Sequence, residues 1–197
     1  VHVNAGAAPK RARSTSWPLP DGFAARGAVV ADVDNDGKAD LLLHGRSGVA
    51  LWRQKPGPTL DFDNVTPSTG ITTTLDVRTA ALVDLDHDGD ADVVLGGAAR
   101  DGGTAAPLAV WRNNGDGTFA DIAASALPGQ APIVATAIVP TDVDLRRDID
   151  LLVLGNDGRL QLWRNMRDAS FRDVSAIVGL DALPPAAAIA VGDVTKD

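Results

Sequence analysis

The stretch ADVDNDGKADLLL, residues 31 to 43, places four aspartates directly before a leucine-rich run. Without a counter-charge, the carboxylates of Asp32, Asp34, Asp36 and Asp40 would repel one another or take up protons. A hard cation such as Ca²⁺ removes this conflict, because it binds six to eight oxygen ligands and tolerates several carboxylates at once. The stretch therefore predicts a calcium-binding loop that leads into a strand.

A second copy of this loop follows in VDLDHDGDADVVL, residues 83 to 95. The aspartate spacing of the first copy recurs at Asp84, Asp86, Asp88 and Asp92, with Gly89 in the place of Gly37. The alternative is a hydrated acidic turn, since Asp and Gly are ordinary turn residues. A turn needs only one or two aspartates, so two loops in register favour two calcium sites.

The loops are not EF-hands, although both motifs begin D-x-D-x-D-G. An EF-hand needs a bidentate Glu at its twelfth position and a helix on either side. The twelfth residues here are Leu43 and Leu95, and the last acid stands at the ninth position. The flanking runs are short and rich in leucine or β-branched residues, which predicts a strand on each side of the loop.

Landmarks recur about every fifty residues, which indicates an internal repeat. Loops begin at Asp32, Asp84, Asp142 and Asp193, and each complete unit then carries a tryptophan on an apolar run and a later phenylalanine. The equivalent residues are Trp52, Trp111 and Trp163, and then Phe62, Phe119 and Phe171. In the first unit we predict strands at 28–33, 39–45, 48–53 and 60–65, and no segment has clear helical periodicity.

Four-stranded units of this period predict the blades of a β-propeller, an all-β fold. Blades are covered on both faces by their neighbours, which explains why LLL, VVL and LLVL are continuously apolar. We divide the chain into the end of a preceding blade, three whole blades and the first strand of a further one, at 1–24, 25–76, 77–133, 134–185 and 186–197. We expect this to be a propeller fragment, completed by the parent's remaining blades or by a second copy.

The loop pattern D-x-D-x-D-G-x-x-D, followed by an apolar strand and a hairpin such as VWRNNGDGTF at 110–119, resembles the FG-GAP or VCBS repeat. These repeats form integrin α-chain propellers and their bacterial relatives. The resemblance covers nearly the whole chain. It implies a propeller, usually of seven blades, with calcium in its hairpin loops and a role in extracellular adhesion or ligand binding. It assigns the ligands to Asp32, Asp34, Asp36 and Asp40, to Asp84, Asp86, Asp88 and Asp92, and to the backbone carbonyls of Lys38 and Asp90.

The third loop departs from the pattern, in TDVDLRRDIDLL at residues 141 to 152. It keeps Asp142, Asp144 and Asp150 but has Arg146 at the fifth position and Arg147 in the place of the glycine. An arginine would place positive charge where the ion should sit, and it could neutralise the remaining carboxylates. We therefore expect calcium in the first two loops and none in the third.

Two other features bear on function. Tryptophan can stack on sugars, but the equivalent places of Trp52, Trp111 and Trp163 on apolar strands favour packing. Trp17 lies outside the repeat and could pack or be exposed. The three histidines are scattered, and no serine, histidine and acid arrangement or general acid and base pair can be recognised. We expect no enzymatic activity from this chain.

The composition excludes several classes of protein. The net charge of −8 and the scarcity of basic clusters argue against nucleic-acid binding. The absence of cysteine excludes disulfides and thiolate metal sites, and no apolar run approaches the roughly 20 residues of a membrane-spanning helix.

We expect a calcium-stabilised module for extracellular protein or carbohydrate binding or adhesion, in a secreted, cell-surface or periplasmic parent. The alternatives are the propeller portion of a secreted polysaccharide-degrading enzyme and a purely structural scaffold. The enzyme would need a cluster of catalytic groups on the face away from the loops, which the sequence does not show.

Overall fold

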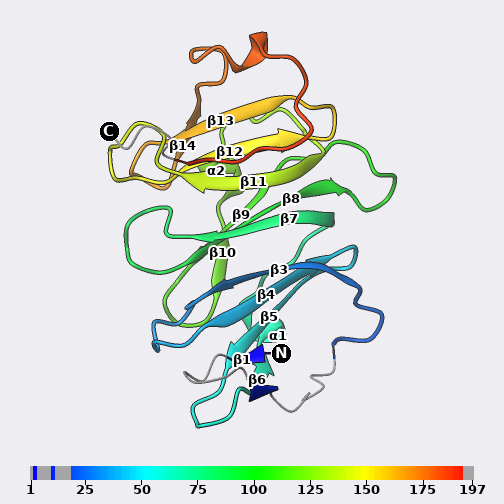
Figure 1. Cartoon of the computed structure of the whole chain (residues 1–197), viewed down its shortest axis with the longest axis vertical. Helices are drawn as coiled ribbons and strands as arrows, with labels where there is room; N and C mark the ends of the chain where they lie inside the picture. Colours follow the sequence, from blue (N-terminus) through cyan, green and yellow to red (C-terminus); the bar gives the residue numbers. More distant parts are fainter. Residues whose placement is uncertain (1, 4–9, 12–18, 193–197) are drawn as a thin grey trace.

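The computed structural model describes residues 2–3, 10–11 and 19–192, and it is built from three four-stranded antiparallel sheets (Figure 1). In each sheet the four strands lie side by side in chain order. The first sheet holds β3 (Ala25–Ala31), β4 (Asp40–Gly45), β5 (Gly48–Gln54) and β6 (Phe62–Asn64). The second holds β7 (Leu75–Val83), β8 (Asp92–Ala99), β9 (Ala109–Asn113) and β10 (Phe119–Asp121). The third holds β11 (Ala135–Thr141), β12 (Asp150–Gly155), β13 (Leu160–Asn165) and β14 (Phe171–Asp173).

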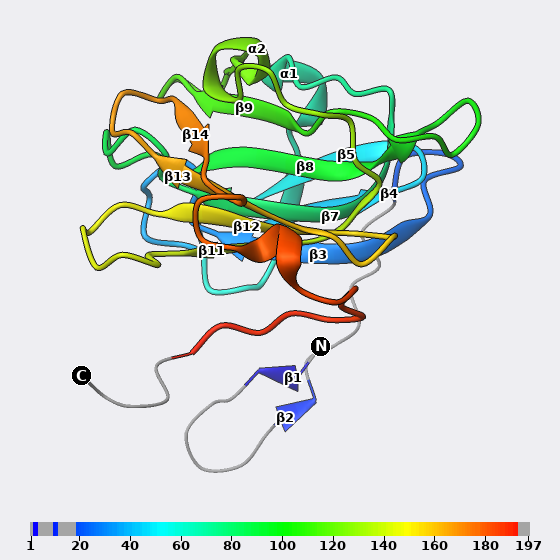
Figure 2. The ribbon, with the colours of Figure 1, turned by 90° about the horizontal axis from the view of Figure 1, so that it is seen from above.

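The three sheets pack on one another as successive blades of a propeller. The first strand of the middle sheet, β7, contacts both β3 and β11, the first strands of the neighbouring sheets. Seen from above, the sheets overlie one another, and the helices α1 and α2 lie together on one side (Figure 2). The prediction of an all-β fold made of four-stranded blades is confirmed.

The strand prediction for the first blade is close, since β3 begins only three residues before the expected start at 28. Sequence reasoning missed α1 (Thr66–Thr69) and α2 (Ala123–Ala126), which follow the fourth strands of the first two blades, and the 3₁₀ turn Leu180–Ala182. A helix of four residues is a single turn, too short to give a periodic pattern.

The ends of the chain leave two predictions untested. Near the start, β1 (His2–Val3) pairs antiparallel with β2 (Lys10–Arg11), and the assignment of 1–24 to a preceding blade stays a prediction. Near the other end, the sequence predicts the first strand of a further blade at 186–197. Residues 186–192 form no strand, and the rest of that segment is not described. Trp17 and Asp193, where the fourth loop begins, lie outside the described residues.

The middle blade is buried on both faces. Val93 packs in a cluster with residues of the first blade, including Leu42 and Leu51, while its neighbour Val94 packs against Leu151 of the third. Both valines are 0% exposed. The continuous apolar run of β8 is therefore explained by a partner on each side.

The repeated tryptophans are packing residues, as predicted. Trp111 lies in the cluster between the first two blades, and Trp163 lies in the cluster between the second and third. Trp52 packs with Phe62 of its own blade, and all three side chains are buried. None of these rings is available as a sugar platform in this arrangement.

A buried histidine lies where the first two blades meet. His44 of β4 pairs with Gly27 of β3, and a Cβ atom at Gly27 would lie 2.4 Å from the His44 Nε2. The His44 Nδ1 lies 3.5 Å from the Val77 carbonyl of the next blade. Burial lowers the pKa of His44, and the nearby positive charge of Arg26 lowers it further.

We predict that His44 makes the protein less stable in mild acid. Because its pKa is lower in the folded state than in the unfolded state, where it is about 6.5, the unfolded chain binds more protons as pH falls below that value. Between pH 7 and pH 5, the melting temperature of His44→Gln should therefore fall less than that of the parent protein. Thermal denaturation in the presence of a metal chelator measures this difference. His87→Asn, at an exposed histidine, is the control and should follow the parent. Equal pH dependence of parent and His44→Gln would contradict the prediction.

Candidate cation-binding loops

The aspartate loops join the first and second strands of each blade. Loop 1 (32–40) connects β3 to β4, loop 2 (84–92) connects β7 to β8, and loop 3 (142–150) connects β11 to β12. Each has nine residues, so equivalent positions can be compared directly.

The ninth-position aspartate anchors each loop in the interior of its blade. Asp40, Asp92 and Asp150 are 0% exposed. The Asp92 carboxylate accepts the Leu85 N–H at 2.9 Å and the Asn113 N–H at 2.7 Å, which ties the loop to the third strand. Asp40 and Asp150 accept the equivalent backbone pairs at 2.8 to 3.1 Å. Burial raises the pKa of all three, that of Asp92 to about 6.

The first-position aspartate closes each loop on itself. Asp32 accepts the backbone N–H groups of Asp36 and Gly37 at 3.1 and 2.8 Å, and Asp142 accepts the two equivalent N–H groups in loop 3 at 3.0 and 2.9 Å. The sixth residue takes a left-handed conformation in all three loops. Gly37 and Gly89 do so without strain, whereas Arg147 does so at φ 67°. Loop 3 thus keeps the shape of the others despite its arginines.

Loop 1 gathers Asp32, Asp34 and Asp36, whose nearest carboxylate oxygens lie within 4.8 Å of one another. The Asp34 Oδ2 accepts a hydrogen bond from Arg53 at 2.9 Å, while its Oδ1 is buried without a partner. The Lys38 ammonium binds the Asp36 Oδ2 at 2.6 Å and lowers the pKa of Asp36. The predicted ligand Asp40 serves as the anchor and lies outside this group.

Loop 2 gathers Asp84, Asp86 and the anchor Asp92 within the same 4.8 Å. The Asp84 Oδ1 is buried without a partner. The pKa of Asp86 is raised, mainly by burial and in addition by the negative charge of Asp88. The predicted ligand Asp88 lies outside the group, and its Oδ1 accepts the Asp90 N–H at 2.9 Å. Whether the carbonyls of Lys38 and Asp90 bind an ion stays a prediction.

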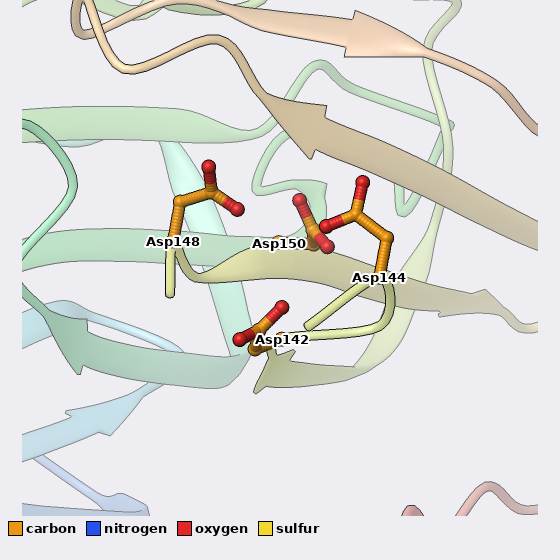
Figure 3. Close-up of side chains that lie close together, drawn as sticks. All are labelled: Asp142, Asp144, Asp148 and Asp150. Carbon is orange, nitrogen blue, oxygen red and sulfur yellow. The ribbon is translucent and has the colours of Figure 1, made fainter. Parts of the chain in front are cut away.

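Loop 3 gathers four carboxylates, more than either other loop among the described residues. They belong to Asp142, Asp144, Asp148 and Asp150, and Figure 3 shows the four side chains close together where β12 begins. Sequence reasoning missed Asp148, because the motif assigns a backbone carbonyl to the seventh position. The signal that could have found it is the acidic side chain at that position.

The loops also connect neighbouring blades. The Asn113 side-chain amide, at the end of β9, donates to the Val33 carbonyl of loop 1 at 2.8 Å, and Asn165 donates to the Leu85 carbonyl of loop 2 at 2.9 Å. Asn35 of loop 1 donates to the Asp90 Oδ1 of loop 2 at 2.6 Å. Each of the first two loops is therefore bonded to the blade that follows it.

Comparison with known proteins bears on this repeated loop. The family model of the FG-GAP-like repeat matches residues 32–95 and 84–153, which together are more than half of the chain. The chain belongs to this family. Both matched segments begin at the first aspartate of a loop, so the acidic loops are part of what the FG-GAP-like repeat model recognises.

No curated protein matches this FG-GAP-like chain. One similar solved structure is an Agrocybe aegerita lectin described as specifically recognising non-reducing terminal N-acetylglucosamine. It shares 20% identity, with a TM-score of 0.37, over 87% of this chain and 58% of its own. The chain thus spans somewhat over half the length of that lectin.

Within the described part of the chain, no helix is long and apolar enough to cross a membrane.

We predict that Asn113→Ala destabilises the protein by about 1–3 kcal/mol, because it leaves the Val33 carbonyl without its side-chain donor. Asn113 is 2% exposed, and it also donates to the Ala91 carbonyl at 3.3 Å. The neighbouring Asn114, which is exposed and bonds only within its own hairpin, provides the control. Urea denaturation should show a loss for Asn113→Ala and almost none for Asn114→Ala. Equal stability of the two variants would refute the bridging role.

Proposed function

We propose that this chain is a calcium-stabilised FG-GAP propeller module that binds an extracellular protein or carbohydrate ligand, with calcium in a structural role. Loops 1 and 2 each bind one Ca²⁺. The observation that carries the calcium assignment is shared by both loops: three carboxylates converge within 4.8 Å, and one inner oxygen of each group is buried without a partner.

The ligand chemistry fits this ion. A buried carboxylate oxygen without a hydrogen-bond donor is costly, and a cation supplies the missing partner. Ca²⁺ accepts several carboxylate oxygens together with carbonyl oxygens and water. Its charge also offsets the repulsion among aspartates that the motif brings together.

The structural role follows from the contacts between blades. An ion that orders loop 1 also orders the Val33 carbonyl and the Asn35 side chain, which bind Asn113 and Asp90 of the next blade. Calcium that binds the folded but not the unfolded protein stabilises the fold by mass action. Each site contributes about 2.7 kcal/mol when the free calcium concentration is a hundred times Kd. Extracellular modules often bind calcium with a Kd of about 10⁻⁴ to 10⁻³ M, so calcium at millimolar concentration would be needed to occupy these loops.

We predict that Asp34→Ala combined with Asp86→Ala removes the two binding events assigned to loops 1 and 2. Titration calorimetry with calcium chloride should show this loss, and the calcium-dependent rise in melting temperature should shrink with it. Asp63→Ala combined with Asp101→Ala removes two exposed aspartates outside the loops and should titrate like the parent. A loop variant that binds as many ions as the parent would refute the assignment.

The ligand part of the proposal is tested separately. The calcium-loaded protein should bind selectively on an array of glycans and extracellular matrix proteins. Because calcium acts on the fold, binding should weaken in chelator in proportion to the loss of folded protein. Equal, unselective signal across the array, from protein shown to be folded, would argue against a recognition role.

A further inference from the structure

We propose that loop 3 is a third divalent-cation site, formed by the side chains of Asp142, Asp144, Asp148 and Asp150. The repeat pattern predicts no ion in this loop, because Arg146 and Arg147 replace the fifth-position acid and the glycine. The structure supplies a different ligand set, in which the seventh residue contributes a carboxylate.

The four carboxylates can contact one ion together. One oxygen from each lies within 4.8 Å of the others (Figure 3). Calcium binds oxygen at 2.3–2.6 Å, so two ligands on opposite sides of the ion lie about 5 Å apart. The spacing of the four oxygens is therefore compatible with a single ion among them.

The Asp148 carboxylate has a buried oxygen that lacks a hydrogen-bond partner, which supports the site separately from the spacing of the four oxygens. This side chain is only 4% exposed, and its Oδ2 accepts a hydrogen bond from the Arg167 Nε at 2.6 Å. Its Oδ1 is buried and has no hydrogen-bond partner. Leaving such an oxygen without a donor costs free energy, which a bound cation would offset.

Arg146 and Arg167 contact one oxygen each of Asp144 and Asp148, and the other oxygen of each carboxylate has no partner. The Arg146 Nε lies 3.2 Å from the Asp144 Oδ2, while the Asp144 Oδ1 is buried without a partner, as on Asp148. The Arg146 and Arg167 side chains are 62% and 55% exposed. Each arginine therefore contacts an Oδ2 atom and leaves the Oδ1 atom of the same carboxylate open to an ion, so the expectation that Arg146 occupies the place of the ion is revised.

A set of four carboxylate ligands favours calcium, which tolerates several carboxylates and does not require one fixed geometry. Magnesium demands near-ideal octahedral geometry and keeps several of its waters, so it suits this crowded set of carboxylates less well. The nearby arginines reduce the net negative charge of loop 3, as Lys38 and Arg53 do in loop 1, so we expect both loops to bind calcium more weakly than loop 2.

The test isolates loop 3 from the other loops. In the Asp34→Ala and Asp86→Ala background, calorimetry with calcium chloride should still show one binding event. Adding Asp148→Asn, which keeps the size of the side chain but removes its charge, should abolish that event. Adding Asp90→Asn, the same change at the seventh position of loop 2, should leave it intact. Thermal melts in chelator check that each variant folds, and Asp148→Asn in the parent repeats the comparison if the background does not fold.

The outcomes separate this proposal from the calcium assignment of loops 1 and 2. If the background binds no calcium while the parent binds two ions, loop 3 is not a site and the proposed function stands. If Asp148→Asn leaves the remaining event unchanged, the proposal is likewise overturned. If the background loses nothing but Asp148→Asn removes one event, loop 3 binds calcium and the assignment of loops 1 and 2 fails.

Discussion

Each blade depends on one fully buried carboxylate. An aspartate in the interior is unfavourable unless donors surround it, and Asp40, Asp92 and Asp150 each receive two backbone N–H groups. One donor comes from the loop and the other from the end of the third strand. The carboxylate therefore fixes the acidic loop against the strand that carries the buried tryptophan, and loop and apolar core become one unit.

That anchoring has a consequence for neighbouring blades. With the loop fixed, the carbonyl of its second residue points to the next blade, where Asn113 or Asn165 donates to it. The same two asparagines donate their backbone N–H groups to the anchoring aspartates of their own blades. One residue thus connects the anchor of its own blade to the loop of the blade before it, so a cation in a loop would stabilise more than the hairpin that holds it.

The sequence predicts the repeated elements well, because each is repeated in register. The apolar runs and the equivalent tryptophans led to four-stranded blades, and two aspartate loops led to the candidate sites. Contacts between blades could not be predicted, since Asn113 and Val33 lie 80 residues apart and share no local pattern. The carboxylate of Asp148 was missed because the motif treats its position as a backbone ligand. The separation of Asp40 from its loop's acidic group likewise depends on tertiary hydrogen bonds.

We propose that all three anchored loops bring carboxylates together around a cation. The most direct measurement is anomalous diffraction from crystals grown with calcium chloride, at a wavelength where calcium scatters anomalously. We expect one anomalous peak in each loop, with the peak in loop 3 lying among the carboxylates of Asp142, Asp144, Asp148 and Asp150. Loops that show only water, or calcium bound elsewhere on the surface, would contradict it.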